Sequence, residues 1–135
     1  ISHVGRWRIK MPRIKESGEN YLETILLLKK KSPGGMVRAI DIVEELGYSK
    51  SSVSRAVNLL KSNGYVDIAK TGAITFTEKG REHALHLYER HQVLTNFFIG
   101  LGVDAETAED DACKIEHIIS EESFNAIKEI INKNS

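Results

Sequence analysis

Three potential metal ligands lie close together near the C-terminus: Cys113, Glu116 and His117. In an α-helix, this i, i+3, i+4 spacing places a thiol, a carboxylate and an imidazole on one face. A soft sulfur donor beside nitrogen and oxygen donors suits a divalent transition metal better than calcium or magnesium. The alternative for a lone cysteine is a small buried hydrophobic residue. The metal site is favoured because His91, on the preceding predicted helix, supplies a further donor.

Length and composition limit the class of protein. The chain has 135 residues, 41% of them hydrophobic, which is enough for one globular domain or two small helical subdomains. A single cysteine forms no internal disulfide, which is typical of a reducing compartment. No apolar run approaches the ~20 residues that a membrane span requires. We therefore expect a cytoplasmic protein that does not contact the membrane, with residues 1–13 as a tag or extended N-terminus outside the fold.

The formal net charge is zero, but the charges are divided along the chain. Residues 1–90 contain 16 Lys and Arg against 10 Asp and Glu, whereas residues 91–135 contain 3 against 9. A basic half suits a polyanionic partner, and an acidic half suits cations or a different interface.

Hydrophobic periodicity predicts three helices in the basic half. The first covers about residues 17–31 and ends at the Ser-Pro-Gly-Gly segment 32–35. The second covers 38–46 and closes at Gly47, the residue type favoured after a helix C-terminus. The third begins at the N-cap Ser49 and continues to Lys61. Two helices joined by a short glycine-containing turn are typical of a helix-turn-helix motif.

The third helix has the polarity expected of a DNA-reading helix. Its apolar stripe leaves short polar and cationic side chains outward, and Arg55 has the geometry to read a guanine edge. Segments 65–69 and 73–77 then predict a β-hairpin wing with Lys70 at its tip, near the DNA backbone. The alternative is an ordinary solvated helix face. We expect these DNA contacts: Arg38, Ser49, Lys50, Ser51, Ser52, Arg55, Asn58, Lys61 and Lys70.

The acidic half is predicted to be helical. A long helix runs from about residue 77 to 98, a second starts at Asp104 or Ala105 and carries the three potential ligands, and Ser120 caps a last one. Leu94, Phe97, Phe98 and Leu101 supply more apolar surface than a small subdomain readily buries, which favours a homodimer interface. The expected fold class is mainly α: a winged helix-turn-helix domain at 14–82, then a helical dimerisation and metal-binding domain at 83–135.

Several segments together resemble the diphtheria toxin repressor family of metal-dependent regulators, which includes the manganese transport regulators. They are residues 19–25, 49–55, 74–80, 90–91 with 102–104, and 112–120, within a resemblance that covers about 14–132. The resemblance implies the two-domain form of a metal-activated transcriptional repressor, not an enzyme. It further implies a homodimer on a palindromic double-stranded DNA operator and control of metal-uptake genes.

The resemblance also implies the metal ligands. Cys113 matches the iron-responsive branch, because the manganese branch has a carboxylate there, whereas Glu23 matches a carboxylate ligand of the manganese branch. Asn20 falls where family members place a Met or Asp ligand, and it offers a neutral carbonyl oxygen. Glu109 falls where the iron branch has a second-site histidine. The full expected set is Asn20, Glu23, His91, Glu109, Cys113, Glu116 and His117.

The expected cofactor is a divalent transition metal. Fe²⁺ is favoured and Mn²⁺ is possible, with Co²⁺, Ni²⁺ or Zn²⁺ as surrogates. Two other interpretations stay open. One is a metal-independent winged-helix regulator in which Cys113, Glu116 and His117 only pack. The other is a small zinc hydrolase, since Cys, His and Glu also hold catalytic zinc.

Overall fold

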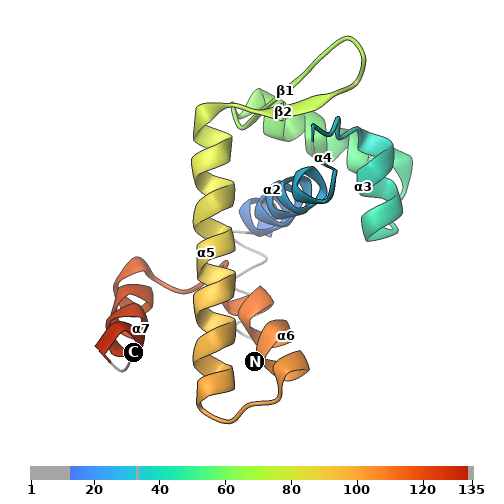
Figure 1. Ribbon diagram of the computed structural model, residues 1–135. Coiled ribbons are helices and arrows are strands. Elements are labelled where there is room, and N and C mark those ends of the chain that lie inside the picture. The colour runs from blue at the N-terminus through green and yellow to red at the C-terminus, as the bar shows by residue number, and fades with distance from the viewer. Residues whose placement is uncertain (1–12, 33, 134–135) are drawn as a thin grey trace. The chain divides into compact units, whose positions relative to one another are not determined.

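The computed structural model describes residues 13–32 and 34–133 (Figure 1). Apart from Arg13, the N-terminal segment expected at 1–13 lies outside the described residues. The chain divides into two compact units, the first ending at Leu85 and the second beginning at His86. The domain boundary expected between residues 82 and 83 stays a prediction.

The first unit is a helical cluster with a small hairpin. Helices α2 (Arg13–Lys31), α3 (Ala39–Leu46) and α4 (Lys50–Ser62) contact one another, and α4 also contacts β1. Their buried side chains form the core, which includes Leu22, Ile25, Ile42, Val53, Val57 and Leu60. The start expected at Ser17 for the first helix was wrong, because α2 begins at Arg13. Residues 13–16 contain neither Gly nor Pro, so nothing in them stops a helix.

The helix-turn-helix prediction is confirmed. Gly47 follows α3 with a φ of 74°, in the left-handed region that glycine occupies without strain, and its N–H bonds the Val43 carbonyl. Two residues later, the Ser49 hydroxyl accepts a hydrogen bond from the Ser52 N–H at 3.2 Å and starts α4.

The predicted wing is present as a short antiparallel hairpin. Strand β1 (Val66–Ile68) pairs with β2 (Ile74–Phe76), in the register Val66 with Phe76 and Ile68 with Ile74. Figure 1 shows the hairpin loop extending away from the helices of its unit. The Ile74 N–H also donates to the Val37 carbonyl at 2.7 Å, which attaches β2 to the segment before α3.

The first turn of α5 (Glu78–Gly100) is fixed against the chain that follows α4. The Thr77 N–H donates to the Tyr65 carbonyl at 3.1 Å, and the Thr77 hydroxyl donates to the Gly64 carbonyl at 2.6 Å. The Lys79 ammonium lies 4.4 Å from the centre of the Tyr65 ring. Gly80 faces the same backbone, and a Cβ atom there would collide with the Tyr65 carbonyl. Only glycine therefore permits this close approach.

The second unit contains the rest of α5, together with α6 (Ala105–Ile115) and α7 (Glu121–Lys133). Leu94, Ala112 and Phe124 form its buried centre, one from each helix. The Asp104 carboxylate caps α6 by accepting from the Glu106 and Thr107 N–H groups at 3.2 and 3.4 Å. Within the described residues, no helix has both the length and the apolar character needed to cross a membrane.

The prediction that one helix carries Cys113, Glu116 and His117 was wrong in part. Helix α6 ends at Ile115, and Glu116 and His117 lie in the turn that follows. The Glu116 N–H still bonds the Ala112 carbonyl, but the N–H groups of Ile118 and Ile119 both converge on the Ile115 carbonyl. The helical ladder therefore closes here, and the chain turns toward α7.

Gly80→Ala should lower the free energy of unfolding by about 1–3 kcal/mol, because the added methyl group displaces a backbone rather than a flexible side chain. Gly18→Ala is the matched control, since its Cβ would meet Leu60 at an ordinary 3.5 Å and would stabilise helix α2 by roughly 0.5–1 kcal/mol. Urea unfolding followed by circular dichroism measures both. Equal midpoints for the two variants would disprove the close approach at Gly80.

Candidate metal centre and nucleic-acid interface

A buried carboxylate is the centre of the candidate metal site. Glu116 is 0% exposed. Its Oε1 lies 2.7 Å from Nδ1 of His91, a hydrogen bond that the protonated ring nitrogen donates. Its Oε2 is buried without a hydrogen-bond partner in the described part of the chain, and it lies 3.6 Å from Nε2 of His117, whose side chain is 2% exposed. One carboxylate and two imidazoles thus converge in the second unit.

Helix packing explains why these groups meet. Ala112 is fully buried in the core that Leu94 and Phe124 also form, so this face of α6 points into the unit. Glu116 lies one turn after Ala112, and its backbone N–H is bonded to the Ala112 carbonyl at 2.9 Å. Glu116 follows the last residue of α6 but keeps helical backbone angles, so its side chain points inward as Ala112 does and meets His91 of α5.

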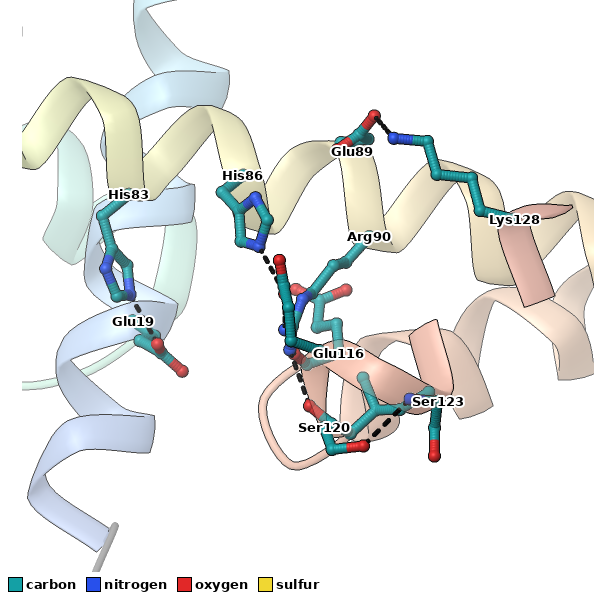
Figure 2. Close-up of polar contacts among 11 residues, drawn as sticks. Glu19, His83, His86, Glu89, Arg90, Glu116, Ser120, Ser123 and Lys128 are labelled. Atoms are coloured by element: carbon teal, nitrogen blue, oxygen red, sulfur yellow. Dashed lines mark hydrogen bonds and ion pairs between the residues drawn. The ribbon is translucent and has the colours of Figure 1, made fainter. Parts of the chain in front are cut away.

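Arg90 holds the turn that carries Glu116 and His117 (Figure 2). Its Nη1 donates to the carbonyl oxygens of Glu116 and Ile119 at 3.0 and 2.9 Å, and its Nη2 donates to Oε1 of Glu121 at 2.7 Å. Sequence reasoning missed this role, although Arg90 belongs to the Arg-His pair that carried the resemblance. Contacts to backbone carbonyls leave no pattern in the sequence.

Charged groups of the second unit shift the pKa values of two of their neighbours, His91 and Glu121. The hydrogen bond to Glu116 raises the pKa of His91, helped by the charges of Glu116 and Glu109 and opposed by burial. Hydrogen bonds from Arg90 and then His86 lower the pKa of Glu121.

The buried donor set fits a divalent metal ion. Burying a carboxylate oxygen without a partner is costly, and almost all buried polar atoms in proteins are satisfied. A cation bound at Glu116 and His91 would satisfy this oxygen. Oxygen and nitrogen donors together suit Mn²⁺, Fe²⁺ and the neighbouring first-row metals.

The other predicted ligands are placed differently. Cys113 is exposed on α6, in contrast to the buried Glu116 one turn later. Glu109 is also exposed on α6, and its charge reaches His91. In the first unit, Glu23 is 9% exposed and Asn20 is exposed on α2. The structure thus brings His91, Glu116 and His117 together, and the ligand roles of all seven residues stay predictions.

Sequence reasoning also missed a partly buried acid–base pair in the first unit. Oε2 of Glu19, on α2, lies 2.5 Å from Nε2 of His83, on α5 (Figure 2). Glu19 is 7% exposed, and the Tyr65 ring packs edge-on against His83. No sequence signal relates two residues 64 positions apart without an alignment. The pair ties the start of α5 to the helix that carries Asn20 and Glu23.

The candidate nucleic-acid interface is formed by α4, whose polar face lies opposite its buried apolar face. Val53, Val57 and Leu60 of α4 face the core. The Ser49 hydroxyl already bonds Ser52, and the Asn58 amide donates to the Ser54 carbonyl at 2.8 Å. Among the predicted DNA contacts Ser52 is half-buried and the remainder are exposed, namely Arg38, Ser49, Lys50, Ser51, Arg55, Asn58, Lys61 and Lys70.

A surface pocket lies between α3, α4 and the hairpin. It has a volume of about 370 Å³, and Arg38, Ser54, Asn58 and Gly72 contribute to its lining. The stem of Arg38 also lies beside the hairpin turn at Gly72. The wing and α4 therefore border one pocket, whose lining also includes the apolar residues Ile40, Val57, Ile68 and Ile74.

In the metal-free protein, the pKa of His91 should lie above its ordinary value, and Glu116→Gln should return it toward that value by removing the charged acceptor. Because the folded-state pKa is raised, this pair stabilises the fold fully below the unfolded-state pKa and loses the contribution as pH rises through the folded-state pKa. NMR titration of the His91 ring measures the pKa, with Glu122→Gln as an exposed control. An unshifted His91 in the wild type would contradict the geometry.

Comparison with known families covers both units. The N-terminal DNA-binding domain of the iron dependent repressor family matches residues 13–74, and the metal binding and dimerisation domain of that family matches residues 77–135. A helix-turn-helix-type transcriptional regulator of Methanocaldococcus jannaschii is 32% identical over 121 residues, which are 89% of this chain and 96% of the relative. The regulator MntR of Lysinibacillus sphaericus is 35% identical over 115 residues, 85% of this chain and 81% of the relative.

Solved structures agree with this assignment. A manganese-dependent transcriptional repressor in complex with manganese is 28% identical, with a TM-score of 0.76 over 85% of this chain and 52% of that chain. The manganese regulator SloR is 25% identical, with a TM-score of 0.74 over 85% of this chain and 53% of that chain. This chain thus spans about half the length of these two structures. The winged helix-turn-helix, the helical metal-binding and dimerisation domain and the matched relatives lead to one conclusion: the chain belongs to the iron-dependent repressor family, whose members are transcriptional regulators and not enzymes.

Proposed function

We propose that the protein is a cytoplasmic, metal-activated transcriptional repressor that binds a palindromic double-stranded DNA operator as a homodimer and controls metal-uptake genes. The observation that carries the proposal is the buried Glu116, whose Oε2 has no hydrogen-bond partner within the described residues. A bound cation would compensate the energetic cost of burying this carboxylate oxygen without a hydrogen-bond donor.

His91, Glu116 and His117 are the proposed ligands in the second unit, with Cys113 and Glu109 on the neighbouring helix. Asn20 and Glu23 are the proposed ligands on α2, in the DNA-binding unit. A bound divalent ion would supply positive charge that several donors share. If both units contribute ligands, metal occupancy favours one arrangement of the DNA-binding units, and the coupling equals the difference in metal affinity between the two states.

The polar face of α4 is the proposed reading surface. Arg55 is proposed to contact a guanine edge, with Ser51 and Ser52 at bases or phosphates and Lys50 and Lys61 at phosphates. Lys70, at the tip of the wing, would add a contact that depends on salt but not on sequence. Arg38, Ser49 and Asn58 border the pocket or the start of α4 and complete the proposed set.

Two observations favour different activating ions. The thiol of Cys113 is a softer donor than a carboxylate and favours Fe²⁺, Co²⁺, Ni²⁺ or Zn²⁺. One solved relative is described as a manganese-dependent repressor and another as a manganese regulator, which favours Mn²⁺. We therefore propose Fe²⁺ or Mn²⁺ as the physiological ion, with the others as surrogates.

Metal should raise operator affinity by about 5- to 150-fold, the usual range for coupling between two sites. The test selects an operator from random-sequence duplexes in the presence of Mn²⁺, and then titrates the full chain with and without metal, using Fe²⁺ under anaerobic conditions as a second arm. Glu116→Gln should lose the stimulation and keep the weak, salt-sensitive binding to any sequence, because it lies outside the DNA-binding unit.

Glu122→Gln is the matched control, since it removes an exposed carboxylate from the same unit. It should respond to metal as the wild type does. Full operator affinity of the wild type in the presence of a chelator would refute metal activation and leave the metal-independent winged-helix regulator.

Cys113→Asp should shift metal preference toward Mn²⁺, because it replaces a soft donor by an oxygen donor. The metal affinity of the wild type should also rise more steeply with pH than that of Cys113→Asp. The thiol must lose a proton before it binds metal, whereas the carboxylate is already ionised. Competition titrations of Mn²⁺ against Co²⁺ measure the preference. Cys113 is not a ligand if cobalt gives no sulfur charge-transfer band with the wild type and the variant keeps the same ranking.

A further inference from the structure

Arg90 is a nearly buried cation that donates most of its hydrogen bonds to the backbone. Its side chain is 13% exposed, and Nη1 donates to the carbonyls of Glu116 and Ile119 at 3.0 and 2.9 Å. Its Nε is buried without a hydrogen-bond partner among the described residues. The guanidinium also lies 5.5 Å from the centre of the Phe124 ring. A side chain used only for a surface ion pair has no need of this arrangement.

The carbonyls that Arg90 holds belong to Glu116, the C-cap of α6, and to Ile119 in the turn that follows. The last carbonyls of a helix have no donor within the helix, so their orientation depends on what else bonds them. Arg90 and His91 are consecutive on α5, and together they hold Glu116 at two points. Arg90 bonds its backbone carbonyl, and His91 bonds its carboxylate at 2.7 Å. The position of the Glu116 side chain is thereby fixed from one helix.

We infer that Arg90 is a positioning residue for metal binding, which holds the Glu116 peptide so that its carboxylate faces His91. The inference rests on the proposed function, because it assumes that Glu116 is a ligand. Groups that orient a ligand typically change metal affinity by about 10- to 100-fold when they are removed. Arg90 donates hydrogen bonds but has no lone pair to offer, so it acts through Glu116 and not on the ion.

Two other roles for Arg90 predict different results. A positive charge near a cation site repels the ion, so an Arg90 that acted only through its charge would tighten metal binding when removed. An Arg90 that only stabilised the fold would change the unfolding midpoint and leave the metal affinity of the folded protein unchanged. The positioning role alone predicts weaker binding by folded protein.

The test measures Mn²⁺ affinity of the full chain by electron paramagnetic resonance of the free ion. Arg90→Met keeps the length of the side chain and removes its charge and donors. Arg90→Lys keeps the charge, but a single ammonium replaces the planar fork that bonds two carbonyls and a carboxylate together. Glu121→Gln is the control, because it removes the exposed ion pair and leaves the two carbonyl contacts.

Arg90→Met should bind Mn²⁺ roughly 10- to 100-fold more weakly than the wild type, whereas Glu121→Gln should stay within about fivefold. Arg90→Lys should lie between the wild type and Arg90→Met, and its Co²⁺ absorption spectrum should differ from that of the wild type because the ligand geometry has changed. Circular dichroism at the assay temperature establishes that each variant is folded.

Wild-type or tighter Mn²⁺ affinity in Arg90→Met would overturn the inference. If Arg90→Met does not fold, Arg90→Lys is the deciding variant. Because it keeps the charge, a Mn²⁺ affinity equal to that of the wild type would exclude a positioning role. These outcomes leave the proposed function intact, because the wild type still binds metal. If the wild type binds no Mn²⁺, Fe²⁺ or Co²⁺, the proposed function fails and this inference fails with it.

Discussion

The second unit depends on keeping an ionisable carboxylate away from water. Removing a charged group from solvent costs several kcal/mol unless hydrogen bonds and opposite charges compensate. Glu116 receives one such bond from His91, and its second oxygen lies 3.6 Å from Nε2 of His117 and has no hydrogen-bond partner among the described residues. Ala112 is buried in the apolar core one turn before Glu116, and Arg90 bonds the carbonyls of the turn that follows.

Local signals in the sequence were enough to predict most of the first unit. Gly47 has a positive φ where a helix must end, and Ser49 caps the next helix with its own hydroxyl, so both boundaries follow from the residue types present. The hairpin was equally predictable, because Gly72 also takes a positive φ between two short β-branched segments. The expected strands extend one residue beyond each end of the observed ones, where the Ala69 N–H still donates to the Ala73 carbonyl and the Thr77 N–H to the Tyr65 carbonyl.

Features that depend on contacts between distant segments could not be predicted. Helical spacing placed Cys113 with Glu116, but which of the two turns inward is decided by where Ala112 packs, and here Cys113 is exposed. The end of α6 at Ile115 depends on the turn that Arg90 holds, which a local pattern cannot encode. Glu19 and His83 meet across 64 positions for the same reason. The sequence was thus enough to predict which kinds of side chain form the candidate site, but not which of them are buried.

The hairpin bears on how copies of this chain associate. A sheet edge with open N–H and C=O groups invites pairing with another chain. Here each strand is three residues long, Val37 bridges to β2, and the middle residue of β1, Asp67, is an exposed charge. Such an edge is too short and too hydrophilic to template a growing sheet. The dimerisation domain of the family matches the second part of the chain. The short, charged hairpin edge therefore keeps two copies from pairing through the DNA-binding domain instead, which would cover the surface that binds DNA.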